Sequence, residues 1–393
     1  MRIAHVTDYY LPRLGGVEMH IRDLATRQKA AGHDVEVITS FRRPKGERAP
    51  EDADHGDGLR VHRLTESMLL PTGWHPWSIR AVRKALREGG YDVVHVHAGP
   101  VTPLAYAAAD LAAEIPTVVT MHSMISYVEP IMRALDVPTR WTRWPAVFTA
   151  VSEVATQPLR RLVSPAPVHV LTNGIDGAEW RIEPEPREPR EVLVAAVMRL
   201  APRKRPRHLL RMLRRAKERL GDDIRFRAVI IGDGPKRIAV ERYVAKHGMA
   251  DWVELPGRLP RAEIRALFAK ADMFVAPATL ESFGIAALEA RCAGLPVVAR
   301  AEGGIVEFVS DGQEGLLASS DDEMVDAIVR LATDQKEREA IAHRNRTSFP
   351  TVNWPDVLDR TTAMYRLATE LSPAVSRRGR RFGGWALRSD SVG

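Results

Sequence analysis

The chain has 393 residues, of which 45% are hydrophobic and 27% charged, so it is long enough to bury the cores of two globular domains. No run of about 18 apolar residues occurs, which argues against a membrane-spanning helix. The opening MRIAHVTDYY lacks a secretory pattern, and we expect a cytoplasmic protein. The single cysteine, Cys292, excludes an intramolecular disulfide and is expected in the core.

The net charge of +7 and an isoelectric point near 9.7 indicate an affinity for anions. Nucleic acid, anionic lipid and a phosphorylated substrate all fit, so charge alone does not choose among them. The arginines stand in short clusters, and the chain has no helix-turn-helix, zinc-finger or RNP signature. We therefore expect no nucleic acid among its partners.

Short β-branched runs alternate with segments of helical period, a pattern typical of βα units on a parallel sheet. The first series of predicted strands lies at 2–7, 33–40, 91–98, 116–123, 146–152 and 168–173. The second series lies at 191–200, 225–234, 252–257, 273–278 and 295–300. The segment DGAEWRIEPEPREPRE between them is rich in proline and charge, as a linker should be.

This pattern predicts an α/β protein of two Rossmann-like, doubly wound domains with a cleft between them. We expect an N-terminal, acceptor-side domain over 1–175 and a C-terminal, nucleotide-sugar-binding domain over 176–353. A helix over 354–372 is expected to cross back to the first domain, and 373–393 to form a mobile basic tail. Ligands of such sheets bind at the carboxyl ends of the strands, which places the expected site in the cleft.

Two carboxylates stand in the otherwise apolar stretch TLESFGIAALEARCAG, which follows the predicted strand at 273–278. Ser282 is expected to cap a helix that ends at Gly294, because serine and glycine favour these two positions. Glu281 would then lie just outside the helix and Glu289 about two turns inside it. For a lone pair of glutamates, an acid near the first turn and an exposed helix residue would be the ordinary interpretation.

The start of this helix also predicts an anion site. The amides of Phe283, Gly284 and Ile285 would point beyond the end of the strand, where helix amides attract phosphate. Arg199 and Lys204 follow the first strand of the second domain at the same sheet edge and would supply cations. A nucleoside-diphosphate sugar has hydroxyls, a diphosphate and a ribose in matching order. The other arginines of that loop are expected on a solvated face: Arg203, Arg205 and Arg207.

Further motifs occur in order along the chain: TDYYLPRLGGVEMHIRDLA, HVHAG, TMHS, AVSE, TNGID, RLAPRKRP, IGDGP, ESFGIAALEARCAGLPVVA and GGIVEFVSDGQEGLL. With them the chain resembles, over nearly its whole length, the retaining GT-B glycosyltransferases of family 4. Their most specific motif is the pair of glutamates with seven residues between them. The resemblance implies transfer of a sugar from a nucleotide diphosphate to a hydroxyl acceptor, with retained anomeric configuration and with no metal or other cofactor.

On this resemblance, Glu281 contacts the sugar hydroxyls, Glu289 the ribose, and Arg199 with Lys204 the diphosphate. His122 faces the sugar from the first domain and joins Glu281, Arg199 and Lys204 as a catalytic residue. The donor-binding residues that the resemblance implies are Gly15, Gly16, Arg199, Lys204, Glu281, Ser282, Phe283, Gly284, Ile285 and Glu289. For His122, which ends a predicted strand, a packed core histidine is the alternative.

Other classes of protein remain to be distinguished. A Rossmann oxidoreductase would need G-x-G-x-x-G after the first strand, and PRLGGVE lacks that spacing. A nucleotide-sugar 2-epimerase or a non-catalytic nucleotide-sugar-binding protein would share the fold. Among donors, GDP-mannose, UDP-glucose and UDP-N-acetylglucosamine all stay open. The opening motif and GDGPKR resemble transferases that act on inositol lipids, so the acceptor could be lipid-linked.

The segment WHPWSIRAVRKALREGGYD predicts a basic amphipathic helix. Its basic stripe comprises Arg80, Arg83, Lys84 and Arg87. Such a stripe beside tryptophans suits peripheral binding to an anionic surface at the inner face of the cell membrane. The alternative is that Ile79, Val82 and Leu86 pack on the first domain while the basic side chains are solvated.

Overall fold

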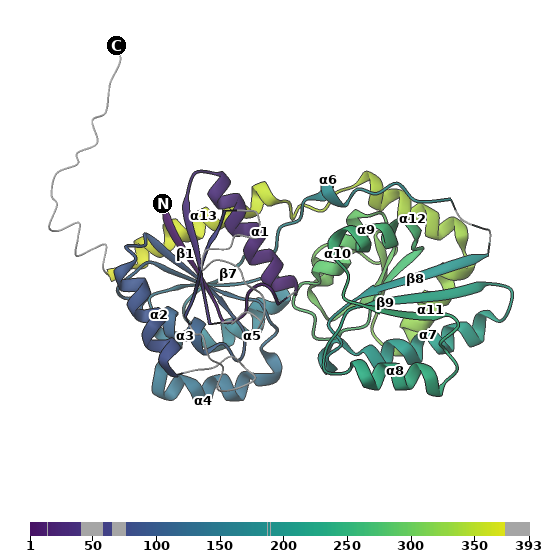
Figure 1. Cartoon of the computed structure of the whole chain (residues 1–393), viewed down its shortest axis with the longest axis horizontal. Helices are drawn as coiled ribbons and strands as arrows, with labels where there is room; N and C mark the ends of the chain where they lie inside the picture. The colour runs from purple at the N-terminus through teal and green to yellow at the C-terminus, as the bar shows by residue number, and fades with distance from the viewer. Residues whose placement is uncertain (14, 41–57, 65–75, 187, 189, 374–393) are drawn as a thin grey trace, which may run out of the picture. The chain divides into compact units, whose positions relative to one another are not determined.

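The computed structural model describes residues 1–393 apart from 14, 41–57, 65–75, 187, 189 and 374–393. The chain divides into two compact units (Figure 1). Unit 1 comprises Met1–Ala150, Thr156–Leu171 and the described residues from Leu358 on. Unit 2 comprises Val151–Ala155 and Thr172–Val357. The predicted basic tail lies, beyond its first residue, outside the described residues.

Unit 1 is built on a parallel sheet with strand order β3-β2-β1-β4-β5-β6-β7 among the described residues. The strands are β1 (Arg2–Thr7), β2 (Asp34–Thr39), β3 (Arg60–Arg63), β4 (Val93–Ala98), β5 (Thr117–Met121), β6 (Val147–Ala150) and β7 (Val168–Val170). Every predicted strand of the first series is present. The sequence patterns missed β3, a short edge strand whose letters RVHR carry no apolar run.

Helices pack on both faces of this sheet. They are α1 (Gly16–Ala30), α2 (Pro76–Glu88), α3 (Pro103–Ala109), α4 (Glu129–Thr139), α5 (Glu153–Val163) and α13 (Trp354–Leu371). Ile21 and Ala25 of α1 and Tyr365 and Ala368 of α13 share one core cluster with strand residues such as Val118. Helices α1 and α13 therefore cover the same face of the sheet.

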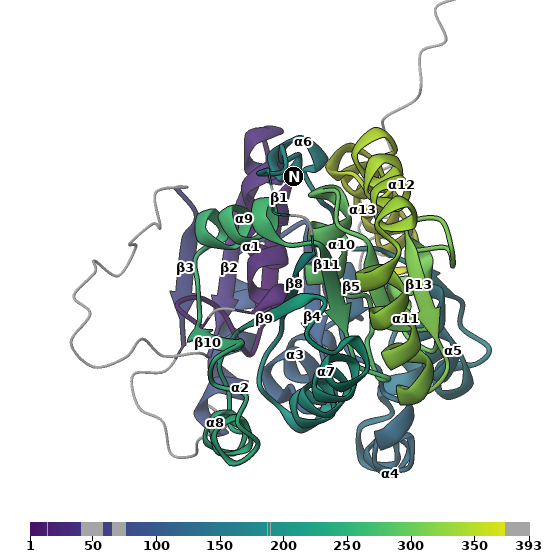
Figure 2. The same cartoon turned by 90° about the vertical axis from the view of Figure 1, so that its right-hand side faces the viewer.

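Unit 2 is built on a parallel sheet with strand order β10-β9-β8-β11-β12-β13 among the described residues (Figure 2). The strands are β8 (Glu191–Val197), β9 (Arg225–Ile231), β10 (Val253–Gly257), β11 (Met273–Ala276), β12 (Val297–Arg300) and β13 (Gly315–Ala318). The helices are α6 (Gly177–Trp180), α7 (Pro206–Leu220), α8 (Arg237–Lys246), α9 (Arg261–Lys270), α10 (Ile285–Cys292), α11 (Asp321–Thr333) and α12 (Gln335–Thr347). Strand β13 was not predicted.

Both sheets have the doubly wound order that reverses next to the first strand. In unit 1 the reversal lies between β1 and β4, and in unit 2 between β8 and β11. The connections that leave neighbouring strands there run to opposite faces of the sheet, so a crevice opens at the carboxyl ends. Ligands are therefore expected at the carboxyl ends of β1 and β4 in unit 1 and of β8 and β11 in unit 2.

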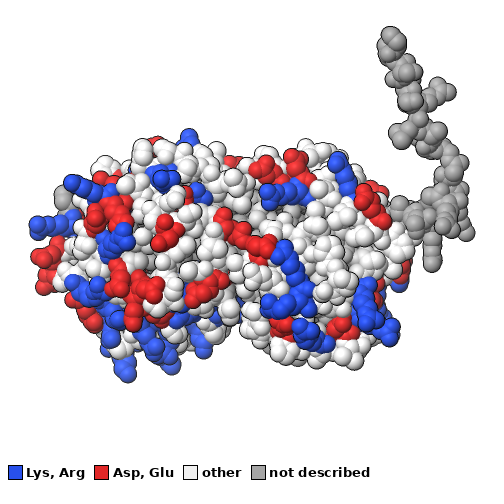
Figure 3. Space-filling model, turned by 180° about the vertical axis from the view of Figure 1, so that it is seen from behind, with Lys and Arg blue, Asp and Glu red and all other residues white. Residues whose placement is uncertain are grey.

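The predicted terminal helix is present as α13, and it begins in one unit and continues in the other. Its first residues, up to Val357, belong to unit 2, whereas the residues from Leu358 on belong to unit 1. Among the described residues no helix combines the length and the apolar character needed to cross a membrane. On the face that Figure 3 shows, basic and acidic side chains are interspersed over much of the surface, with several basic side chains together along the lower edge at the left.

Candidate functional site

Close backbone contacts hold together the loops at the carboxyl edge of the unit 2 sheet. Gly232, at the end of β9, has φ +134°, and a Cβ there would lie 1.8 Å from the carbonyl oxygen of Met198. A Cβ on Gly304, which follows β12, would lie 2.2 Å from the carbonyl oxygen of Ser282. The amide of Gly304 also donates to the carbonyl of Glu281 at 2.8 Å. Glycines therefore allow the loops after β8, β9, β11 and β12 to pack backbone against backbone.

These loops bring the Lys204 ammonium to the Glu281 carboxylate, and the two form an ion pair. Lys204 ends the short helix η3 (Pro202–Lys204) after β8, and Glu281 lies in the loop after β11. Their side chains are 30% and 13% exposed, so the pair is shielded from bulk water on most sides. Arg199 lies in the same loop as Lys204 and is exposed. Three of the predicted donor-binding residues, Arg199, Lys204 and Glu281, thus lie where the strand order of the unit 2 sheet reverses.

Helix α10 begins later than the sequence suggested, so the predicted cap at Ser282 is wrong. The structure ends the loop with Gly284 at φ +97°, and the helix starts at Ile285. Phe283 stays in the loop because its ring is buried against Phe308, with ring centroids 5.5 Å apart.

The later start changes which groups can meet an anion. The amides of Ala287 and Leu288 donate to the carbonyl of Gly284, at 2.9 and 3.0 Å. The amides that helix geometry leaves for a ligand are therefore those of Gly284, Ile285 and Ala286, and the predicted anion contact of Phe283, which lies in the loop, stays a prediction. Glu289 lies about one turn inside the helix and is 9% exposed, which contradicts the ordinary interpretation of it as a solvated residue.

The side chain of Arg205 is held by hydrogen bonds inside unit 2, whereas the sequence predicted it on a solvated face. Its guanidinium donates two hydrogen bonds, of 2.9 and 2.8 Å, to the Asp321 carboxylate and a third, of 3.1 Å, to the carbonyl of Pro277. Arg300 also reaches Asp321, at 3.2 Å. Burial acts to raise the pKa of Asp321, but the hydrogen bonds and the charge of Arg205, together with the charge of Arg300, outweigh it, so the pKa lies below its usual value. These hydrogen bonds, here called the Arg205–Asp321 clasp, connect the loop that carries Lys204 to the first residue of α11.

In unit 1, the predicted glycines lie at the start of α1. Gly15 caps the helix and Gly16 is its first residue. A Cβ on Gly15 would lie 2.4 Å from a carboxylate oxygen of Glu18, so the glycine leaves room for this buried acid. Arg13 forms an ion pair with Glu18 at 3.1 Å. The space at this turn is thus filled by a carboxylate from the first turn of α1.

His122 follows β5 at the carboxyl edge of the unit 1 sheet, as predicted. Its amide donates to the carbonyl of Ala98 at 2.9 Å and extends the ladder by one residue. The residue is 6% exposed, and burial lowers the pKa of its imidazole to about 4. Its Nε2 lies 2.9 Å from Nδ1 of His97. His122 is therefore buried and neutral at physiological pH, and its catalytic role stays a prediction.

The basic stripe of α2 is largely paired with acids of the same unit. Arg83 contacts Asp110 at 2.5 Å, and Arg87 makes two hydrogen bonds, of 2.7 and 2.6 Å, to Glu114. Lys84 lies 3.9 Å from Glu88. The apolar side of the helix, with Val82 and Leu86, is buried. Packing and ion pairing thus explain most of the amphipathic pattern, although Arg80 is exposed beside the Trp77 ring, 5.9 Å from its centroid.

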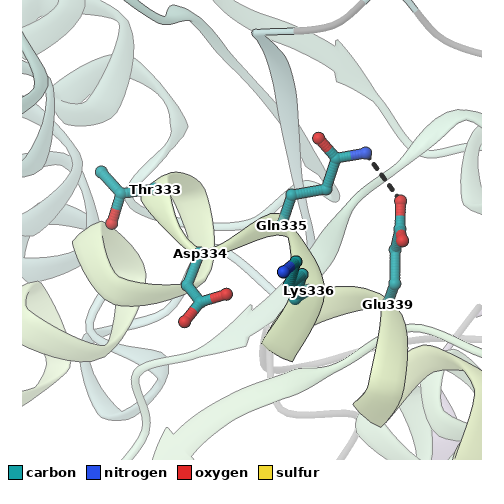
Figure 4. A pocket seen from close by; sticks show the side chains of 5 residues that line it. All are labelled: Thr333, Asp334, Gln335, Lys336 and Glu339. Carbon is teal, nitrogen blue, oxygen red and sulfur yellow. Dashed lines mark hydrogen bonds between the residues drawn. The ribbon is translucent and has the colours of Figure 1, made fainter.

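A surface hollow lies where α11 meets α12, away from the predicted site residues. Its lining, shown in Figure 4, comprises Thr333, Asp334, Gln335, Lys336 and Glu339. Asp334 caps α12 by accepting from the amide of Glu337 at 2.9 Å, and Gln335 donates to Glu339 at 2.7 Å. These side chains serve the helix junction, so we assign no ligand to the hollow.

Two parallel, doubly wound units are the architecture of the GT-B fold, and Lys204 and Glu281 lie at the strand-order reversal of the unit 2 sheet. Two family models match the chain in succession: Glycosyltransferase Family 4 over residues 14–179 and Glycosyl transferases group 1 over residues 179–348. Together they span most of the described residues, and the chain belongs to the glycosyltransferases that combine these two domains.

Named relatives agree with this assignment. The chain is 28% identical to a phosphatidylinositol N-acetylglucosaminyltransferase component from Arabidopsis thaliana, over 98% of this chain and 87% of the relative. It is 27% identical to the GDP-mannose-dependent alpha-(1-6)-phosphatidylinositol monomannoside mannosyltransferase of Mycobacterium tuberculosis, over 90% of this chain and 94% of the relative.

Solved structures share the fold. Sucrose-phosphate synthase from Thermosynechococcus elongatus superposes with a TM-score of 0.74 at 19% identity, covering 94% of this chain and 100% of its own. The Anabaena protein HepE in complex with UDP and glucose superposes with a TM-score of 0.72 at 20% identity, covering 92% of this chain and 98% of its own. At these identities the likeness establishes the GT-B architecture alone.

Proposed function

We propose that this glycosyltransferase moves a hexose from a nucleoside-diphosphate sugar to a hydroxyl of an inositol-containing glycolipid, with retention of anomeric configuration. The relatives that act on phosphatidylinositol compounds support the acceptor class. Their names indicate different sugars, so GDP-mannose and UDP-N-acetylglucosamine are both candidate donors, with UDP-glucose a third. A soluble hydroxyl acceptor is the second candidate.

The Lys204–Glu281 ion pair carries the proposal. Breaking the bond between sugar and diphosphate leaves negative charge on the departing oxygens, and fixed cations stabilise that charge best. Lys204 and Arg199 stand at the strand-order reversal, and the first-turn amides of α10 add further donors. When a diphosphate takes up part of the Lys204 charge, the Glu281 carboxylate becomes able to accept hydrogen bonds from sugar hydroxyls.

Glu289 and His122 have the remaining roles in this proposal. The buried carboxylate of Glu289 lies about one turn into α10 and would accept hydrogen bonds from ribose hydroxyls. His122 has a pKa lowered to about 4 by burial, so it acts as a neutral hydrogen-bonding group toward the sugar and carries no proton as an acid. Protein cations take the part that a metal plays in other transferases, and we expect turnover to persist in EDTA.

Release and transfer of a radiolabelled sugar test this function. Each of the three candidate donors would be incubated with the protein alone, with an inositol-lipid extract and with a water-soluble extract. Label that moves from one donor into the organic phase supports the proposed transfer. Label that enters only water-soluble products favours the second candidate, and no release from any donor contradicts both.

We also propose peripheral binding to an anionic membrane, but through α4 as well as α2. Four apolar side chains along and just before α4 are exposed, namely Tyr127 at 46%, Ile131 at 60%, Leu135 at 43% and Val137 at 80%. Ile131 and Leu135 lie four residues apart within α4 and so share one face of it, while Tyr127 lies in the short helix η1 (Ser126–Val128) that precedes it. Arg140 and Arg143 follow the helix and are exposed. An apolar stripe flanked by arginines suits insertion between anionic headgroups.

Vesicle co-sedimentation tests this binding. The variant Ile131→Ser with Leu135→Ser and Val137→Ser should lose most binding to phosphatidylinositol vesicles. Replacing Arg80, Arg83, Lys84 and Arg87 by Ser should reduce binding less, because three of these side chains are already paired with acids. Equal sedimentation of wild type and the α4 variant would rule out α4 as the contact.

A further inference from the structure

Five buried histidines lie close together in unit 1, and the proposed transfer uses only one of them. They cluster on the sheet face that α1 and α13 cover, and they are His5, His20, His95, His97 and His122. Desolvation is the main cause that lowers the pKa of each imidazole, so all five are neutral at physiological pH. A neutral imidazole has one donor and one acceptor nitrogen, so its neighbours determine its tautomer.

A continuous chain of hydrogen bonds links His122 to helix α1. Nε2 of His122 lies 2.9 Å from Nδ1 of His97, and Nε2 of His97 lies 2.9 Å from Nδ1 of His5. Nε2 of His5 lies 2.7 Å from the amide oxygen of Gln28, which comes from the last turns of α1. Three strands and one helix thus contribute to a single row of side chains.

The row continues from α1 to α13. The Gln28 amide nitrogen donates to the Tyr365 hydroxyl at 2.9 Å, and this hydroxyl lies 2.9 Å from Nδ1 of His95. Nε2 of His95 lies 2.7 Å from the Thr120 hydroxyl, which in turn lies 2.6 Å from that of Thr149. Gln28 and Tyr365 are 3% and 1% exposed, so water does not compete for these bonds.

The Gln28 amide gives the whole row one direction. A carbonyl oxygen can only accept, so Nε2 of His5 carries its proton and Nδ1 of His5 accepts from Nε2 of His97. Nδ1 of His97 must then accept from Nε2 of His122. The remaining ring nitrogen of His122, Nδ1, is left as an acceptor. On the other arm, the Tyr365 hydroxyl accepts from Gln28 and therefore donates to His95.

We propose that Gln28 and Tyr365 are positioning residues that set the tautomer of His122 through His5 and His97. The inference rests on the proposed function only in that it takes His122 to be the group that meets the sugar. The Thr149 hydroxyl donates to the carbonyl of Val119 at 3.4 Å, so Thr149 accepts from Thr120, Thr120 from His95, and His95 from Tyr365. The Tyr365 hydroxyl must therefore accept from the amide nitrogen of Gln28, which leaves the amide oxygen facing His5. With the amide turned over, every donor in the row would reverse, and His122 would present a proton where it now presents a lone pair.

A bound metal ion is the competing explanation of the cluster. One nitrogen each of His5, His95 and His97 lies within 4.8 Å of the others, as a three-histidine site requires. However, the nitrogens that His5 and His97 turn toward each other are 2.9 Å apart, closer than the roughly 3.3 Å that tetrahedral zinc ligation imposes. Hydrogen bonds between neutral rings explain this separation without an ion.

Nitrogen-15 NMR of the histidine side chains tests the proposal, because protonated and unprotonated ring nitrogens resonate far apart. The full chain would be compared with Tyr365→Phe, which removes one oxygen, and with Gln28→Leu. In the wild type we expect the proton of His122 on Nε2. In both variants we expect a mixture of the two tautomers at His122. Tyr106→Phe removes a hydroxyl of unit 1 outside the row, and it should keep the wild-type spectrum.

Three results would overturn the proposal: a His122 proton on Nδ1 in the wild type, an unchanged single tautomer in both folded variants, or stoichiometric zinc in the purified protein. Circular dichroism and melting temperature show whether the variants are folded, and Tyr365→Phe remains informative if Gln28→Leu is not. Turnover is measured in parallel, and kcat should fall several-fold while KM changes little. Since the spectra need no substrate, failure of the proposed transferase role would leave their outcome intact.

Discussion

Lys204 and Glu281 neutralise each other in the chain without ligand, and donor binding should affect the two partners differently. On the proposed roles, Lys204 would keep a negative partner throughout, because a phosphate would take over from the carboxylate. Glu281 would exchange a cation for neutral hydroxyls, so its proposed role depends on accepting hydrogen bonds while charged. Loss of either side chain should therefore affect the transfer step more than the fold.

We predict that Glu281→Gln and Lys204→Ala each lower the rate of transfer by about 10²–10³, the usual cost of one lost interaction with a developing charge. Both variants should melt within a few degrees of the wild type, because neither side chain is fully buried and both residues lie between the main helices and strands of the unit 2 sheet. Initial rates with the preferred donor are the measurement. Arg203→Ala, an exposed change in the same loop, is the matched control. Near-normal turnover in either site variant would remove that residue from the site.

At the scale of elements, the sequence predicted most strands because buried parallel strands are continuous β-branched runs. The strands it missed lack such runs: β3 reads RVHR at a sheet edge, and β13 begins with glycine and has four residues. The start of α10 was misplaced because Ser282 is a favourable cap, whereas tertiary packing of Phe283 decides where the helix begins. The Arg205–Asp321 clasp joins residues 116 apart, and no local pattern can indicate such a pair.

The packing of loops against each other predicts a strong effect for Gly304→Ala. A methyl group there would meet the backbone of Ser282 at 2.2 Å, so the loop after β12 must move away from the loop that carries Glu281. We expect a lower melting temperature, by several degrees, and a loss of donor affinity in a thermal-shift titration.

Gly99→Ala is the control for this change, because a methyl group on Gly99 would make only ordinary contacts, at 3.6 and 3.7 Å. It should leave the melting temperature nearly unchanged. If Gly304→Ala had the same melting temperature and the same donor affinity as Gly99→Ala, the close approach of the loops after β11 and β12 would be incorrect.

For the whole molecule, the buried histidines make stability depend on pH. The pKa values of His5 and His122 are lowered from 6.5 to about 4 in the folded chain, and those of the other three fall as well. Between these values the unfolded chain binds more protons than the folded chain, so stability is present above pH 6.5 and is lost as the pH falls toward 4. One such histidine lowers the free energy of unfolding by about 2 kcal/mol at pH 5.

Asp8 acts in the opposite sense, because burial raises its pKa to about 6 and the folded chain then holds the extra proton below that pH. One carboxyl cannot offset five imidazoles, so we predict a lower melting temperature at pH 5 than at pH 7.5. Calorimetry at the two pH values is the measurement, and the exposed change His343→Gln should preserve the difference. An equal or higher melting temperature at pH 5 would show that the cluster is not neutral and buried.

The division of α13 between the units sets the order in which the chain can fold as it is synthesised. Unit 2 is continuous from Thr172 to Val357 apart from one short segment, and its entry and exit are joined by the amide of Ile175, which donates to Val352 at 3.0 Å. Unit 1 lacks Tyr365 until the last helix leaves the ribosome. The later-encoded unit can therefore be complete first, while Gln28 and His95 of the first unit still lack the hydroxyl of Tyr365 that they contact in the finished fold.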